Sequence, residues 1–269
     1  MQCVWEKDRN IKNIDNTLGD SLMKILIKIL LLLVVSSQLY AYETNSMFYT
    51  IVPSDLAFKQ FEFTISHRFQ GKFNEDPFDN FFGMHGGASV AVGFRAGIPY
   101  HLEVGWHYLY YNREMNFDVA KNIDLTWHLK SKIFYQFDSF RPVFYLEERE
   151  KSNDIGIALE RSFLNNKLTP VLNLQYDGYY KNMGTCIGID YQVTKKIGFF
   201  AEYFPRRDND DDTYSKNAIL YGLRLNTYGH RFLLTVSNSR ETGLRHVMRG
   251  ADTGDLYFGF SIHRLLEIY

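Results

Sequence analysis

The stretch ASVAVGFRAGIPYHLEVGWHYLY, residues 88–110, decides the fold. In its first half, every second side chain is apolar, at Ala88, Val90, Val92, Phe94 and Ala96. The second half repeats this pattern after residues 97–101, at Leu102, Val104, Trp106, Tyr108 and Tyr110. A two-residue period is that of a β-strand, whose successive side chains point to opposite faces. The stretch therefore predicts two antiparallel strands joined by a short turn.

The same alternation recurs to the end of the chain, most clearly at 155–159, 187–193, 199–203, 219–225 and 258–262. Short connections are expected at 97–101, 138–141, 164–167, 194–196 and 228–229. They take turns with mostly longer ones at 70–86, 112–113, 149–153, 178–181, 206–215 and 240–254. This order is typical of outer-membrane barrels, which have short periplasmic turns and longer external loops.

These connections predict an all-β fold, an antiparallel up-and-down transmembrane β-barrel of about twelve strands with both ends on the periplasmic side. Residues 114–137 are counted as one long strand but could be two. The alternation also falters after Ile262, so that either a short tail follows the last strand or the strand continues in a shifted phase. A count of about ten or about fourteen strands therefore stays open.

The beginning of the chain predicts export. Residues 25–35 are apolar, Lys24 and Lys28 precede or interrupt their start, and Ala41 follows a pair of serines. This is the layout of a secretory signal peptide, so residues 1–41 are interpreted as the signal region, with Met23 as an alternative start. An N-terminal anchor helix is the other interpretation, although the apolar run is short for a membrane span. Residues 42–57 are expected to form a periplasmic N-terminal segment and residues 58–269 the barrel domain.

Composition excludes several classes of protein. A net charge of −1 over 269 residues gives no basic surface for nucleic acid. No apolar run of about 18 residues follows residue 41, which excludes a helical membrane protein. Once residues 1–41 are removed, Cys186 is the only cysteine, so neither an internal disulfide nor a lipid anchor is expected.

The face opposite the apolar one is small, polar or charged. Its candidate lumen-facing charges are Arg68, Arg95, Glu103, Glu202 and Arg224. For Arg68 the functional interpretation is anion binding, and the plainer one is a place in an internal network of arginines and acids. Aromatic side chains near the strand ends favour a membrane barrel with an interfacial girdle. A soluble exported barrel that binds an apolar ligand, with the apolar face inward, is an alternative.

Two segments resemble a bacterial β-barrel family known only as a domain of unknown function. Residues 61–69, FEFTISHRF, are similar to the opening strand of that family. Residues 229–232, 238–239 and 259–264 follow the order and spacing of its final hairpin, and residues 81–83 and 201–205 also fit. The resemblance implies a barrel resident in the outer membrane, and it implies no substrate, cofactor or active site.

Catalytic and metal sites are weakly indicated. Ser261 and His263 stand two positions apart and so share a face, which would suit a lipid hydrolase, but this spacing is common by chance. His230 and Asn238 could form a base and its orienting partner, although a role in the last hairpin is the plainer interpretation. The acidic run 208–212 could bind Ca²⁺ but lacks the features of an EF-hand loop.

The sequence thus predicts an outer-membrane barrel that is either structural or a narrow pore for transport, without catalysis, metal or cofactor. An outer-membrane lipid hydrolase is an alternative. Expected partners are membrane lipid and the barrel-assembly machinery, which would read the aromatic end at Tyr269. The substrate is not predicted.

Overall fold

The structure is a computed structural model that describes residues 46–75, 78–111, 113–125, 129–141, 148–207 and 214–267. Twelve antiparallel strands form one closed barrel. The strands are β1 (Gln60–Lys72), β2 (Ala88–Ile98), β3 (Leu102–Leu109), β4 (Glu114–Asp124), β5 (Leu129–Phe140), β6 (Glu150–Arg161), β7 (Leu168–Asp177), β8 (Asn182–Gln192), β9 (Ile197–Phe204), β10 (Ala218–Thr227), β11 (His230–Ser237) and β12 (Tyr257–Glu267). Two short helices, η1 (Met84–Gly86) and α2 (Leu244–Val247), lie in connections. No helix within the described ranges is long and apolar enough to cross a membrane.

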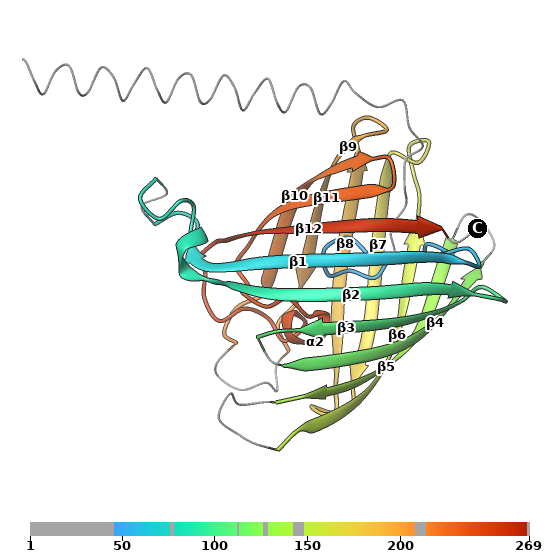
Figure 1. Cartoon of the computed structure of the whole chain (residues 1–269), viewed down its shortest axis with the longest axis horizontal. Helices are drawn as coiled ribbons and strands as arrows, with labels where there is room; N and C mark the ends of the chain where they lie inside the picture. Colours follow the sequence, from blue (N-terminus) through green and yellow to red (C-terminus); the bar gives the residue numbers. More distant parts are fainter. Residues whose placement is uncertain are drawn as a thin grey trace, which may run out of the picture. The chain divides into compact units, whose positions relative to one another are not determined.

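Each strand pairs with its neighbours in the chain, and the first strand pairs with the last. Gln60 faces Glu267 and Arg68 faces Gly259 across the β1–β12 seam, which lies at the front of Figure 1. Closing the seam leaves the barrel no open edge, so the strands' backbone groups are paired around the whole circumference. The predicted up-and-down barrel of twelve strands is confirmed.

The side chains of the barrel show the reverse of the burial found in a soluble protein. Along β4, the inward positions Asn116 and Asp118 are 6% exposed, whereas the outward positions Phe117 and Val119 are 49% and 47% exposed. Buried charges beneath an apolar outer surface are the arrangement of a barrel whose outer face contacts lipid. A soluble barrel with the apolar face inward, the alternative left open by the sequence, does not fit this surface.

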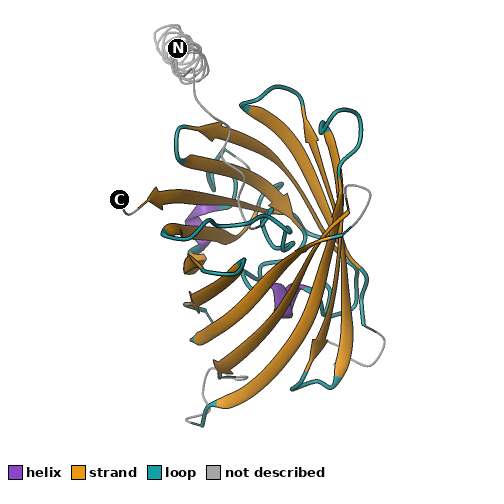
Figure 2. Cartoon of the chain, turned by 90° about the vertical axis from the view of Figure 1, so that its right-hand side faces the viewer, coloured by secondary structure: helices purple, strands orange, loops and turns teal. Residues whose placement is uncertain are grey.

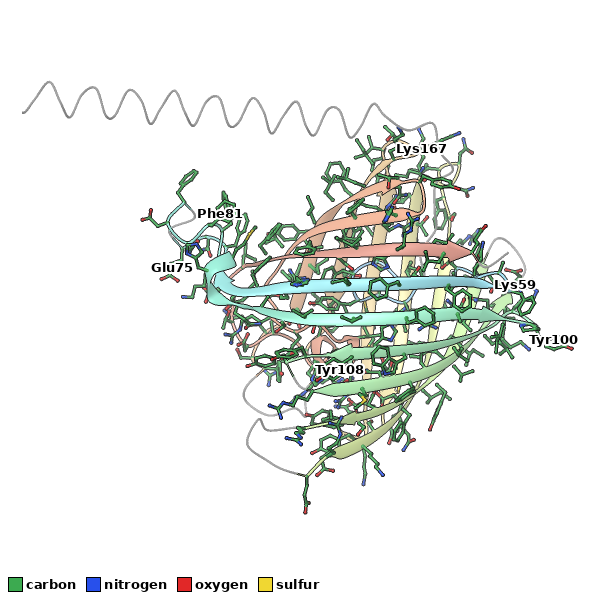
Figure 3. The ribbon with its side chains drawn as sticks, in the orientation of Figure 1. Lys59, Glu75, Phe81, Tyr100, Tyr108 and Lys167 are labelled. Atoms are coloured by element: carbon green, nitrogen blue, oxygen red, sulfur yellow. The ribbon has the colours of Figure 1, made fainter. Side chains whose placement is uncertain are left out.

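The short and long connections lie at opposite ends of the barrel. Figure 3 places Lys59 and Tyr100 at one end of β1–β3 and Glu75 and Phe81 at the other. We call these the turn end and the loop end. The N-terminal side of β1 and the C-terminal side of β12 both lie at the turn end, because Gln60 pairs with Glu267.

The predicted strand count was right because two errors cancelled. Residues 114–137 contain all of β4 and most of β5, with a connection at 125–128. The predicted tight turn at 138–141 falls mostly on the end of β5, and the connection to β6 lies at 141–149. The predicted loop at 149–153 is mostly part of β6.

The glycines of the inner face make room for lumen side chains. A Cβ atom on Gly105 would lie 2.1 Å from the Asp118 carboxylate and 3.0 Å from the Arg95 guanidinium. A Cβ atom on Gly93 would lie 2.3 Å from the His107 ring. The small residues of the polar face therefore allow large charged side chains from neighbouring strands to cross the lumen.

Two segments outside the strands fill the barrel, as Figure 2 shows for the loops within the ring of strands. One is residues 46–57, which we call the plug; the other is the connection 238–256 with α2. Met47 and Leu56 of the plug are each 4% exposed. This differs from the expected periplasmic segment at 42–57, because residues 46–57 pack against lumen side chains. Residues 42–45 and the signal region lie outside the described residues.

The last strand, β12, keeps its inward–outward alternation as far as Glu267. β12 continues to Glu267 with Leu266 facing outward at 43% exposure, so there is neither a shift nor a tail before residue 267. The pattern falters in the sequence because Arg264 takes an outward position, where its guanidinium lies 2.8 Å from the ring of His230. Tyr269 lies outside the described residues.

Candidate functional site

The five charged residues predicted to face the lumen all lie in the interior of the barrel. Arg68, Glu103 and Glu202 are at most 1% exposed, and Arg224 is 5% exposed. The Arg95 side chain is 12% exposed. The structure does not gather them at one point: Arg95 and Glu103 share one network, Arg224 pairs with Asp190 at 2.7 Å, and Arg68 and Glu202 each contact the plug.

The plug begins with a tight turn whose amide groups converge on Glu202. A bridge between Ser46 and Ile51 closes the turn. Within it, the N–H groups of Phe48, Tyr49 and Thr50 donate to Oε1 of Glu202 at 3.0, 3.0 and 2.9 Å. Successive amides on one side of a turn form a concave anion site. Here the anion is a carboxylate of the barrel wall on β9.

Arg68 of β1 contacts the same turn through the aromatic side chains of the turn. The guanidinium lies over the Phe48 ring at 4.7 Å and near the Tyr49 ring at 6.0 Å from the centroids. Its Nη1 donates to the carbonyl of Tyr257 at 3.1 Å, and its Nε and Nη2 have no hydrogen-bond partner in the described part of the chain. Cation–π contact is strong when the cation is desolvated. The turn is thus fixed by opposite charges, Glu202 on its amides and Arg68 on its rings.

The next plug residues pair with neutral side chains of β7 and β8. The Asn173 side chain accepts from the N–H of Ile51 at 2.7 Å and donates to its carbonyl at 2.8 Å. This two-point contact imitates the backbone pairing of a β-ladder. The hydroxyl of Thr50 lies 2.9 Å from the sulfur of Cys186, which is fully buried.

The end of the plug is anchored to a buried charge network. Lys132 of β5 donates to the carbonyl of Ser54 at 2.9 Å and to both oxygens of Glu103 at 3.1 and 3.0 Å. Glu103 also accepts from the N–H of Leu56 and pairs with Arg95 at 3.3 Å. Because these charges are buried, each needs a partner, and the plug's backbone supplies part of the pairing.

At the turn end, Asp55 ties the plug to two turn-end residues. His101 lies 2.5 Å from the Asp55 carboxylate, and the Asn122 amide donates to its other oxygen at 2.7 Å. The hydrogen bond that His101 donates to Asp55 raises the pKa of His101 above its ordinary 6.5, and the negative charge of Asp55 acts in the same direction. This contact is exposed, so the pH of the solution changes the protonation of His101 directly.

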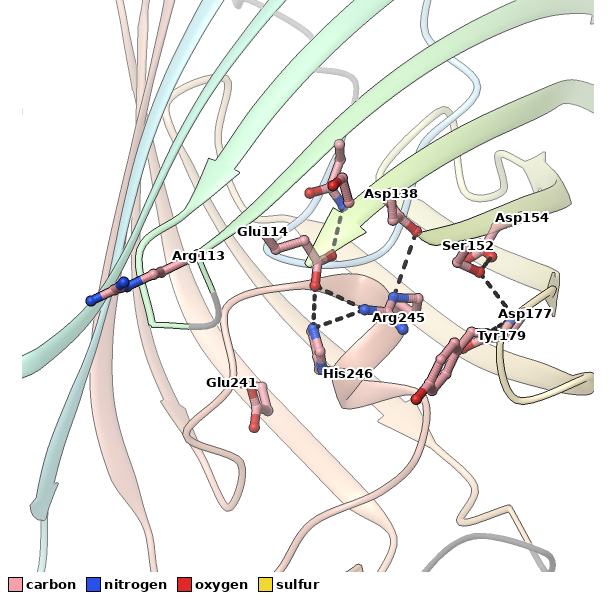
Figure 4. Close-up of polar contacts among 12 residues, drawn as sticks. Arg113, Glu114, Asp138, Ser152, Asp154, Asp177, Tyr179, Glu241, Arg245 and His246 are labelled. Carbon is pink, nitrogen blue, oxygen red and sulfur yellow. Dashed lines mark hydrogen bonds and ion pairs between the residues drawn. The ribbon is translucent and has the colours of Figure 1, made fainter. Parts of the chain in front are cut away.

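The connection 238–256 closes the lumen from the loop end. Arg245 of α2 pairs with Glu114 at 2.9 Å and with Asp138 at 3.6 Å (Figure 4). Its guanidinium also lies over the Phe140 ring at 3.8 Å. His246 Nε2 lies 2.6 Å from the same Glu114 carboxylate. Glu114 and Asp138 stand on neighbouring strands, so one arginine fixes α2 to two strands of the wall.

The two closing segments meet inside the barrel. The hydroxyl of Tyr49 in the plug donates to the backbone carbonyl of Glu241. The plug and the loop therefore meet inside the lumen and together obstruct part of it.

A cavity of about 130 Å³ remains beside this obstruction. Its wall is formed by the plug, by the loop and by the inner faces of β1–β5. The residues that line it include Phe48, Tyr49, Glu62, Ser66, Ala91, Arg95, His107, Leu109, Asn116, Asp118, Phe134 and Thr242.

Ser261 and His263, the weak catalytic candidates, face the lumen and belong to a hydrogen-bonded chain. His263 Nε2 lies 3.1 Å from Ser261 Oγ, and its Nδ1 lies 3.3 Å from Glu62 Oε1. An acid, a histidine and a serine in this order can activate the serine as a nucleophile. Ser261 and His263 are each only 1% exposed, however, and the barrel wall separates them from lipid.

The other weak candidates have structural places or lie outside the described residues. Gly229 has φ +64°, as the tight turn before His230 requires. The Asn238 side chain bridges the N–H of Ile219 and the carbonyl of Asn217 at 2.8 and 2.9 Å. The acidic run 208–212 lies outside the described residues.

Sequence reasoning missed the partners Lys132, Asn173 and Arg245. Alternation along β5 and β7 was a usable signal for Lys132 and Asn173, since it places both on the inner face. No local pattern points to their contacts with the plug. Arg245 lies in a connection, where period-two reasoning does not apply.

Comparison with known proteins supports a membrane barrel. Residues 146–266, from β6 to near the end of β12, match the family described as "Membrane bound beta barrel domain (DUF5777)". The predicted resemblance to an uncharacterised β-barrel family is confirmed. Together with the apolar outer face, this match makes the protein a membrane-bound β-barrel of the outer-membrane type, in contact with lipid. No curated protein sequence matches the chain.

Several solved barrels are similar in structure at very low sequence identity. The KdgM porin and the NanC porin each align over 76% of this chain and 98% of their own, at 6% identity and a TM-score of 0.48. The outer membrane protein Omp33 from Acinetobacter baumannii aligns over 77% of this chain and 98% of its own, at 6% identity and a TM-score of 0.44. These values are too low to carry a conclusion about function.

Proposed function

We propose that the protein is a narrow outer-membrane passage for small solutes and that its own plug, residues 46–57, closes the lumen. The observation that carries this proposal is the clamp on the plug turn, where Glu202 accepts three amide hydrogen bonds. A barrel of about twelve strands leaves at most a narrow channel, so one short segment is enough to block it.

The barrel wall does not depend on the plug for its own closure. Backbone pairing between β1 and β12 seals the ring. The plug instead makes polar contacts with side chains of β3, β5, β7 and β9, at Glu103, Lys132, Asn173 and Glu202. Met47, Phe48 and Tyr49 of the plug also pack in an apolar cluster with Val171, Phe200 and Phe204, so undocking the plug costs apolar burial as well as these polar contacts. The wall keeps its own backbone pairing in either case, so the plug can leave the lumen while the barrel stays folded.

The competing functions are less well supported by the geometry. A lipid hydrolase needs a nucleophile that its substrate can reach, and Ser261 is enclosed on the lumen side. A silent structural barrel is the closer competitor. It shares every feature of the wall but predicts that the plug never moves.

Export and assembly complete the proposal. Residues 1–41 act as the signal region, with Met23 as an alternative start, and the barrel-assembly machinery inserts the barrel by reading its aromatic C-terminus. Cleavage after Ala41 would place the new N-terminus four residues before the first described residue of the plug. A mature chain that starts there would have its plug at its free end.

A disulfide lock tests the proposed gate. Thr50 Oγ1 lies 2.9 Å from Cys186 Sγ, so a T50C variant brings two thiols within reach of a bond. We expect oxidation to join the plug to β8 and to abolish conductance in planar bilayers, and reduction to restore it. The wild type, which lacks the second thiol at the plug, is the control. A variant without residues 46–57 is expected to conduct under oxidising and reducing conditions alike, at a level limited by the connection 238–256.

Two outcomes contradict the gate. One is a T50C protein that mass spectrometry shows to be cross-linked but whose conductance is the same before and after reduction. The other is a folded variant without residues 46–57 that stays closed.

A further inference from the structure

The cavity beside the plug is the size of a single sugar ring. Its volume is about 130 Å³, and a buried water needs roughly 10–15 Å³ on the same measure. The space therefore holds on the order of ten heavy atoms. It lies where the plug turn, α2 and the strands β1–β5 meet, so a solute here would be in contact with both closing segments.

One acceptor of the cavity wall is unsatisfied. Asn116 is 6% exposed and donates through Nδ2 to Glu114 at 3.0 Å, while its Oδ1 has no hydrogen-bond partner in the described part of the chain. A buried amide oxygen without a donor costs about 1–3 kcal/mol. Asn116 lines the cavity and its Oδ1 is covered within the wall, so a donor in the cavity relieves this cost once the amide turns towards it.

A hydroxyl on the opposite wall is held in a fixed place. Ser66 Oγ lies 2.7 Å from Ser261 Oγ, which lies 3.1 Å from the ring of His263, which in turn is held by Glu62 at 3.3 Å. Ser66 and Glu62 line the cavity, and Ser261 and His263 stand behind them. The chain of hydrogen bonds thus prepares a polar wall, which reduces the entropy lost when a ligand binds.

The charged side chains of the cavity wall already have partners beside them. Arg95 pairs with Asp118 at 2.6 Å and with Glu103 at 3.3 Å. Glu62 has His263 as its partner. An ion in the cavity would have to compete with these pairs, whereas a neutral ligand leaves them intact.

The remaining wall is apolar and partly aromatic. Phe48 of the plug, Leu109 of β3 and Phe134 of β5 contribute their side chains. Apolar walls with a few fixed polar groups are the usual make-up of a ligand site. Rings and methyl groups suit the C–H faces of a sugar, while the hydroxyl and amide groups suit its rim of hydroxyls.

From these features we infer that the cavity binds a small neutral polyhydroxylated solute of the size of a monosaccharide. The inference rests on the proposed passage, because it names the class of solute that would rest between plug and loop. The polar groups on the wall disfavour a lipid. The charged side chains of the wall already have partners, which disfavours a small ion.

Titration of the purified protein in detergent tests the site, with D-glucose and D-galactose as probes and saturation-transfer NMR as the readout. D-Glucuronate and D-glucosamine serve as charged counterparts. We expect saturable binding of at least one neutral sugar and weaker binding of both charged ones. N116A should weaken binding by about fivefold, as the loss of one hydrogen bond implies. A91F should abolish binding by filling the cavity from β2.

The control is N153L, which removes an asparagine that bonds Tyr135 at 2.6 Å on the outer face of the barrel. It should bind as the wild type does, and heat-dependent gel migration shows that every variant is folded. Absence of saturable binding of both neutral sugars to folded wild type overturns the inference. The inference is also overturned if folded N116A and A91F bind the sugars as tightly as the wild type does. Sugar binding by a barrel that never conducts would refute the passage alone. Conductance by the plug deletion, together with no sugar binding by the wild type, would refute only this site.

Discussion

The clamp at Glu202 predicts how strongly the plug is held. Glu202→Ala removes the acceptor of three buried amides, those of Phe48, Tyr49 and Thr50. Each buried donor left without a partner costs about 1–3 kcal/mol. We take the lower end because water can enter the vacated space, which gives about 3 kcal/mol for three donors. That free energy corresponds to an increase of about a hundredfold in the ratio of undocked to docked plug.

Single-channel recording measures this ratio as the ratio of open to closed time. We expect wild type to be closed most of the time and E202A to show an open-to-closed ratio about a hundredfold higher. Oxidative cross-linking of T50C to Cys186 should slow in the E202A background, since fewer plugs are docked at any moment.

The matched control is D190N. Asp190 is a lumen carboxylate that pairs with Arg224 at 2.7 Å, so the variant removes the same charge from the lumen at a site that binds no plug amide. The reasoning is refuted if folded E202A opens no more often than wild type. It is equally refuted if D190N opens as often as E202A, because lumen charge alone would then explain the effect.

Three further predictions concern the anchors of the two closing segments and the lipid-facing surface. The hydrogen bond to Asp55 raises the pKa of His101, so protonated His101 stabilises plug docking below pH 6.5 and this contribution is lost as the pH rises through the raised pKa. Thiolate formation speeds T50C cross-linking in both backgrounds as the pH rises, so the readout is the rate in the parent divided by the rate in H101Q, and this ratio should fall over that range. Arg245→Ala should lower the free energy of unfolding by about 3–5 kcal/mol, because it leaves Glu114 with less compensation; urea unfolding in detergent that shows under about 1 kcal/mol would contradict a buried ion pair. Ile187→Arg should cost about 2–4 kcal/mol in lipid vesicles, since this outward side chain is 48% exposed; an unchanged stability there would argue against lipid contact.

Alternation predicted the barrel because it reports which face each side chain takes. It failed where polar residues occupy strand ends. Ser152 and Asn153 were assigned to a loop because they are polar, yet they continue β6, with Ser152 in the polar lumen and Asn153 on the outer face. It failed also at 124–129, where no glycine or proline marks the connection between β4 and β5.

The inner positions of charged residues could be inferred from the sequence, but their partners could not. Arg95 meets Glu103 across a hairpin, a neighbouring contact that the turn at 99–101 brings about. Glu202, in contrast, meets amides of Phe48, Tyr49 and Thr50 that are more than 150 positions away, and amides carry no sequence signature. The plug has no periodicity of its own, because its backbone is satisfied by side chains of the wall rather than by a neighbouring strand.

The plug also fixes an order of events during biogenesis. It is synthesised before any strand, yet its partners lie on strands made much later: Asn173 is 122 positions and Glu202 153 positions from the plug residues they bind. Contacts of such separation form late, since the loop between them must close first. The plug therefore docks only after β7 and β9 have formed in the wall. The seam joins residues still further apart, Gln60 and Glu267, so by the same reasoning it closes last. The plug can then dock on β7 and β9 while the ring is still open, and the barrel closes around a segment that is already in place.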